Sequence, residues 1–80
     1  MRVMHRLVGY DLDTDRMKVR VEVPLDLLAE AKRIAQVGEN DPDAAWSYPL
    51  SDEQARELAA LVGTGLEAGR MEFFLEAFAG

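Results

Sequence analysis

The chain has 80 residues, of which 49% are hydrophobic and 30% charged, a composition typical of a small folded domain rather than a disordered segment. It contains one histidine and no cysteine, which excludes disulfide frameworks and zinc sites built from thiolates. Residues 34–80 hold nine Asp or Glu but only two Lys or Arg, and the net charge of −6 disfavours nucleic acid as a partner.

The apolar stretches disfavour two further classes of protein. The first stretch is interrupted by His5 and Arg6 and ends at Asp11, so it does not have the pattern of a signal peptide. No apolar run approaches the length of a membrane span. We therefore expect a cytoplasmic protein of bacterial type, a single domain over residues 1–80, with no membrane contact.

Residues 3–23 predict an antiparallel β-hairpin. Apolar residues alternate with charged ones from Met17 to Val23, which is the period of a half-buried strand, and residues 3–10 are also rich in strand-forming types. Residues 12–15 form the predicted turn, with Asp15 in the left-handed conformation that Asp tolerates. The turn places Asp11 opposite Arg16.

This turn fixes a register for the hairpin. Its apolar face has four predicted pairs: Tyr10 with Met17, Val8 with Val19, Arg6 with Val21, and Met4 with Val23. On the charged face His5 lies opposite Glu22, as a cross-strand pair at the solvent. Arg6 is then the one misfit on the apolar face, and we expect it to reach the solvent at an edge or to pair with a C-terminal carboxylate.

Three helices are predicted after Pro24. The first runs from Leu27 to Ala35 and has Gly38 as its C-cap. The second begins at a capping box over residues 51–54 and ends at Gly63. The third covers residues 71–78, because four apolar residues follow the spacing i, i+3, i+4, i+7: Met71, Phe74, Leu75 and Phe78.

The predicted fold class is α+β, an N-terminal antiparallel hairpin packed against two or three helices in the order ββααα. The segment from Trp46 to Tyr48 precedes a proline and is expected to be extended. It forms either a short extra strand or a cover over the core.

The residues from Leu7 to Thr14 resemble the nucleophile loop of haloacid-dehalogenase-type phosphatases, in which a hydrophobic strand ends in Asp-x-Asp. The resemblance covers only these residues, and it implies that Asp11 attacks phosphorus while Asp13 acts as acid and base beside a magnesium ion. Asp15 stands where the family has Thr or Val, and the strand continues into a hairpin where the family builds a parallel sheet.

The same segment also has the spacing of a calcium loop. Asp11, Asp13, Asp15 and Glu22 match its acidic positions, but Arg16 stands where the loop requires glycine. We interpret the segment as an Asp-rich turn and predict no catalytic, cofactor-binding or metal-binding residues. The alternative is a metal site at the three aspartates.

The predicted function is a non-catalytic protein–protein interaction module. Its interaction surface comprises Trp46, Tyr48, Phe73 and Arg20, since large aromatics outside the predicted helix stripes mark contact surfaces. The partner is another protein, as for a small acidic inhibitor or immunity-type protein, or a second copy, because a two-stranded sheet leaves both edges unpaired. The alternative function is a small metal-dependent hydrolase that uses Asp11 and Asp13.

Overall fold

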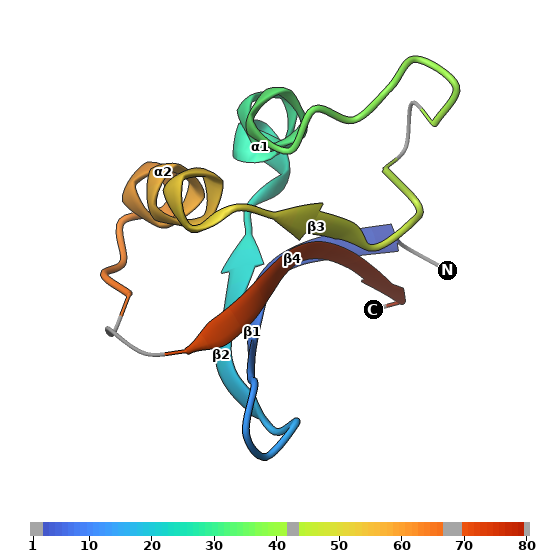
Figure 1. Cartoon of the computed structure of the whole chain (residues 1–80). Coiled ribbons are helices and arrows are strands. Elements are labelled where there is room, and N and C mark those ends of the chain that lie inside the picture. The colour runs from blue at the N-terminus through green and yellow to red at the C-terminus, as the bar shows by residue number, and fades with distance from the viewer. Residues whose placement is uncertain (1–2, 42–43, 67–69, 80) are drawn as a thin grey trace.

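The computed structural model describes residues 3–41, 44–66 and 70–79, and these residues form an α+β fold with a four-stranded antiparallel sheet and two α-helices (Figure 1). In chain order the elements are β1 (Val3–Asp11), β2 (Met17–Val23), the short 3-10 helix η1 (Leu25–Leu27), α1 (Leu28–Ile34), β3 (Tyr48–Leu50), α2 (Asp52–Val62) and β4 (Met71–Ala79). The strand order is β2-β1-β4-β3. Neither helix is long and apolar enough to cross a membrane.

Both helices lie on one face of this open sheet, as Figure 1 shows. We call this side the covered face and the other side the open face. The covered face carries alternate strand residues, among them Leu7, Val21, Phe73 and Leu75, and the open face carries the residues between them, among them Arg6, Val8 and Phe74.

The prediction of a third helix over residues 71–78 is wrong, because these residues form β4. The strand lies between β1 and β3 and pairs with β1 from Val3↔Ala79 to Asp11↔Met71. A central strand carries apolar side chains on both faces, and here Leu75 lies on the covered face while Phe74 and Phe78 lie on the open face. Together, the apolar residues on the two faces of β4 reproduce the i, i+3, i+4, i+7 spacing that is typical of a helix. The predicted order ββααα is therefore wrong, and the observed order of strands and α-helices is ββαβαβ.

An extra strand is present in the middle of the chain, but it is β3 rather than the segment from Trp46 to Tyr48. β3 begins at Tyr48 and pairs Leu50 with Phe73. It contains Pro49, which has no backbone N–H to donate, and such a residue suits the edge of a sheet.

The predicted hairpin exists, but most of its predicted register is wrong by one residue. Tyr10 pairs with Met17 as predicted, and a β-bulge then leaves Lys18 unpaired, so that Gly9 pairs with Val19 and Leu7 with Val21. A shift of one residue exchanges the faces of a strand. Leu7 therefore joins the β2 valines on the covered face, where the prediction had Arg6.

The bulge also overturns the predicted position of His5. Its strand neighbours are Val23 and Ala77, not Glu22, and the residue is 4% exposed rather than at the solvent. Its Nε2 lies 3.0 Å from the carbonyl oxygen of Ala44. The loop before β3 thus covers this part of the sheet.

Several local predictions are confirmed. Asp15 has φ 58°, and the Asp11 N–H donates to the carbonyl oxygen of Arg16 at 2.8 Å. Ser51 begins α2 with a complete capping box, and Gly63 ends it in the left-handed conformation.

The predicted C-cap of the first helix is wrong. α1 ends at Ile34, well before Gly38, and Gln36 has the left-handed conformation with φ 57°. The chain turns there without glycine.

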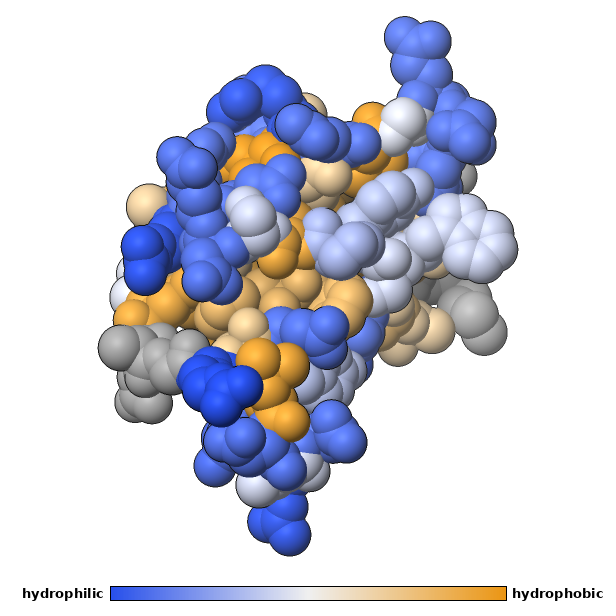
Figure 2. Space-filling model, in the orientation of Figure 1, coloured by the Kyte–Doolittle hydropathy of each residue, from blue (hydrophilic) through white to orange (hydrophobic). Residues whose placement is uncertain are grey.

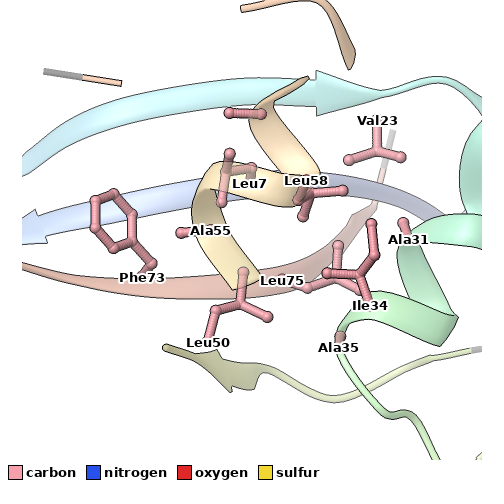
Figure 3. Packing of buried hydrophobic residues seen from close by; sticks show 11 residues of the cluster. Leu7, Val23, Ala31, Ile34, Ala35, Leu50, Ala55, Leu58, Phe73 and Leu75 are labelled. Carbon is pink, nitrogen blue, oxygen red and sulfur yellow. The ribbon is translucent and has the colours of Figure 1, made fainter. Parts of the chain in front are cut away.

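The hydrophobic core fills the space between the covered face and the two helices (Figure 3). Ala55 and Leu58 of α2 lie over Leu7 and Leu75, and α1 adds Ile34 at one side. Leu7, Leu58 and Leu75 are fully buried. Alanines where the helices meet the sheet leave room for these larger side chains, so the small helical layer can seal the middle of the sheet.

Candidate interaction surface

The outer side of β2 is one of the two edges of the described sheet. β2 pairs with β1 on one side, and no other described strand pairs with it on the other. The main contacts of α2 with the sheet are to β1, β3 and β4, while β2 packs chiefly against β1. A strand edge of this kind presents unpaired backbone N–H and C=O groups.

The side chains of β2 show the same lack of cover. Val19 and Val21 point to the covered face and pack against the core, but both are only partly buried, while Val23 nearer to α1 is buried. Arg20 and Glu22 point to the open face and are exposed. β2 therefore combines an apolar row that the helices leave unfinished with a charged row of both signs.

A hollow of about 220 Å³ lies beside the C-terminal end of β2. Its walls include Val3, Met4, Val23 and Leu25. Leu25 is 73% exposed, and Val3 is also exposed. Apolar walls open to solvent make this hollow suitable for an apolar side chain of a partner.

The open face next to β2 carries a network of charged and aromatic side chains. The Arg6 guanidinium donates to Oε1 of Glu76 through Nη2 at 2.7 Å and through Nε at 3.1 Å. Its central carbon lies 4.7 Å from the ring centroid of Phe78. The prediction that Arg6 pairs with a C-terminal carboxylate is thus confirmed, and the pair holds the side chain flat on the sheet.

Tyr10 extends this network. Its hydroxyl donates to Oε2 of Glu76 at 3.3 Å, and its ring meets Phe74 edge to face at 6.0 Å between centroids. Burial, and then the charge of Glu76, raise the pKa of Tyr10 above its ordinary value. Val8, which lies on this face, is 0% exposed, so the network covers the sheet in place of a second layer of helices.

The Asp-rich turn uses its first carboxylate within the turn itself. Oδ1 of Asp11 accepts hydrogen bonds from the N–H of Asp13 at 2.8 Å and of Thr14 at 3.1 Å. These two bonds lower the pKa of Asp11. In the part of the chain that the structure describes, no three His, Asp or Glu side chains form a group that could hold a metal ion, and Asp11, Asp13 and Asp15 are included in that finding. β1 also lies in an antiparallel sheet, unlike the strand of the phosphatase family that the segment resembles.

The four predicted surface residues do not form one patch. Trp46 is 70% exposed and precedes β3, while Arg20 is exposed on β2 at the opposite edge of the sheet. Phe73 is only 7% exposed and belongs to the core, so it is not available as a contact residue.

Tyr48 is half-buried and secures the loop before β3. Its hydroxyl donates to Oδ2 of Asp41, whose Oδ1 accepts from the N–H of Ala45 at 3.0 Å. The bond from Tyr48, followed by the backbone bond from Ala45, lowers the pKa of Asp41. The bond to Asp41, followed by burial, raises the pKa of Tyr48. The loop that carries Trp46 is thereby fixed to the sheet.

Sequence reasoning missed the valine row of β2, Glu22 and the hollow at Leu25. The alternation of valine with charge was visible, but it indicates only a strand with two unlike faces. β2 becomes an outer edge because β4 returns to the other side of β1, and no local pattern in residues 17–23 reveals this.

Comparison with known proteins places the chain in a family. The sequence model of one family, Domain of unknown function (DUF7683), matches residues 4–76. No curated protein and no solved structure matches the chain. The matched residues extend from β1 into β4 and so include both central strands and both helices. The chain belongs to the DUF7683 family.

Proposed function

We propose that this chain is a non-catalytic protein–protein interaction module that binds its partner along β2. The observation that carries the proposal is the unpaired outer edge of β2, along which Val19 and Val21 are only partly buried. A partner segment that adds a strand there gains backbone hydrogen bonds and covers the valines at the same time. The hollow at Leu25 then takes an apolar side chain at the end of the added strand.

The charge of the helical layer supports a basic target. α2 exposes Asp52, Glu53 and Glu57 against a single exposed Arg56, and much of the surface in Figure 2 is hydrophilic, with apolar patches between the charged groups. Negative charge on α2 speeds the approach of a positively charged protein. The proposal therefore includes the role of a small acidic inhibitor or immunity-type protein.

The test compares two valine-to-lysine variants as baits in a native cell lysate. Val19→Lys places a charge on the unfinished apolar row of β2, where it opposes strand addition. Val62→Lys makes the same change at a half-buried valine at the end of α2, outside β2. Circular dichroism first establishes that both variants are folded.

We expect a protein captured by the parent chain to be retained by Val62→Lys and lost by Val19→Lys. Capture that is equal with both variants would show that binding does not use β2. Capture that both variants lose would locate the contact on the helical side, and the proposed site would then be wrong.

A further inference from the structure

We propose that the β2 edge also binds a second copy of this chain, paired antiparallel about a two-fold axis at Val21. The inference rests on the proposed function, since it assumes that β2 is the binding edge. It is carried by the sequence Val-Arg-Val-Glu-Val of residues 19–23, which forms the part of β2 that follows the bulge.

These five residues are complementary to themselves. An antiparallel pair centred on Val21 places Arg20 of each copy opposite Glu22 of the other, because the two positions are equally distant from the centre. The same axis brings Val21 opposite Val21 and Val19 opposite Val23. Every valine then meets a valine, and every charge meets the opposite sign.

Neighbouring registers lack this match. With the axis at Arg20, the two Arg20 side chains meet each other. With the axis at Glu22, two carboxylates meet. An axis between residues 20 and 21 places Arg20 of one copy opposite Val21 of the other. These two side chains belong to opposite faces of the strand, so neither the valines nor the charges are matched. Only the axis at Val21 satisfies both rows.

The open face already contains half of the resulting charge pattern. Arg6 lies between Glu76 on β4 and Glu22 on β2 in the strand register. The Arg20 of a second copy, placed next to Glu22, continues the row as Glu76, Arg6, Glu22, Arg20, with alternating sign across four strands. Glu22 would thus have an arginine on both sides.

The helices leave room for this arrangement. A two-fold axis perpendicular to the sheet keeps the covered faces of both copies on one side, so the helices of the two copies share that side. α2 packs chiefly on β1, β3 and β4, and the main packing of β2 is against β1. The product is a continuous eight-stranded sheet in which the partly buried Val19 and Val21 of both copies are covered at the centre.

The test uses charge reversal at the two exposed positions, with sedimentation velocity from micromolar to millimolar concentration as the measurement. Arg20→Glu sets glutamate against glutamate, and Glu22→Arg sets arginine against arginine, twice in each dimer. We expect each variant to weaken self-association about tenfold or more, since two attractive pairs become repulsive. Lys18→Glu is the matched control, because it changes the charge of β2 by the same amount at the bulge, outside the central pairs.

Mixing the two variants gives the decisive result. In a mixed dimer, one chain has glutamate at both positions and the other has arginine at both, so each pair across the axis again joins opposite charges. Two chains that are separately monomeric should therefore associate when combined. The double variant Arg20→Glu/Glu22→Arg should also dimerise by itself. Rescue of this kind excludes misfolding as the cause of the losses in the single variants.

A parent chain that stays monomeric over the whole concentration range would overturn the inference. So would a dimer that Arg20→Glu leaves intact, or the absence of association in the mixture. If the parent chain is monomeric but Val19→Lys alone loses a captured protein, the homodimer is wrong and the proposed function stands. If no binding depends on β2, both are wrong.

Discussion

The two faces of the sheet exclude water in different ways. On the covered face, Leu7 and Leu75 are buried beneath two helices whose contacts are almost entirely apolar. On the open face, Val8 is equally buried, but its strand neighbours are Arg20 and Phe74, and the same face carries the pair of Arg6 with Glu76. The stability of an apolar core depends on the amount of surface that it buries. The stability of a single layer of polar and aromatic groups depends on the geometry of their contacts. A face of the second kind retains side chains that can meet a partner.

The largest expected effect is on the covered face. Leu75→Ala removes a fully buried side chain beneath α2, and we expect it to lower the free energy of unfolding by about 2–5 kcal/mol. In so small a domain this loss is a large part of the total stability. Urea unfolding followed by circular dichroism measures it, and the same substitution at exposed Leu12 is the control. Equal losses at the two positions would contradict the assignment of the core.

The second effect tests how closely β1 approaches its neighbours on the covered face. A Cβ atom on Gly9 would lie 2.9 Å from Cε1 of Phe73 and 3.2 Å from Cβ of Val19. We expect Gly9→Ala to cost about 1–3 kcal/mol in thermal or urea unfolding, because the buried ring must move. In a Phe73→Leu background the ring is absent, and the added cost should be smaller. A neutral Gly9→Ala in the parent chain would show that the ring is not confined.

The third effect is on the open face and should be smaller. Arg6 and Glu76 have side chains 21% and 22% exposed, so their pair is partly desolvated, and we expect a coupling of about 1 kcal/mol in a double-mutant cycle with Arg6→Met and Glu76→Gln. The exposed pair of Arg33 and Glu30 is the control and should show no measurable coupling. A larger coupling for the exposed pair would show that partial burial does not strengthen the pair of Arg6 with Glu76.

The sequence predicts the features that depend on neighbours along the chain. The turn at Asp15 and the capping box at Ser51 follow from single residues whose local chemistry permits few alternatives. The fold class could also be predicted, since alternation and helical spacing both occur in the chain.

What could not be predicted depends on residues far apart in the sequence. The return of β4 to the free side of β1 buries both faces of the central strands, and this burial gives β4 an apolar spacing that imitates a helix. The bulge at Lys18 reverses the faces of β2, and nothing in residues 17–19 identifies it. The edge that we propose for binding depends on both events, and the sequence alone singled out Phe73, a core residue, rather than Val21.

The smallest effect compares the two tyrosines of the chain by their titration. Tyr10 has a raised pKa chiefly because the open face desolvates its ring, whereas the pKa of Tyr48 is raised chiefly by its hydrogen bond to Asp41. Both groups are neutral when protonated, and their pKa is higher in the folded chain than in the unfolded chain. Their contribution to stability is therefore complete below pH 10 and is lost as the pH rises through the raised values.

The measurement is tyrosinate absorbance against pH in variants that each retain one tyrosine. In Tyr48→Phe, adding Glu76→Gln should lower the pKa of Tyr10 only in part, since burial remains. In Tyr10→Phe, adding Asp41→Asn should return Tyr48 most of the way to its ordinary value, because it removes the main cause. If Glu76→Gln returned Tyr10 fully, charge rather than exclusion of water would control the pKa there. The open face would then be wetter than the buried Val8 implies, and its comparison with the covered face would fail.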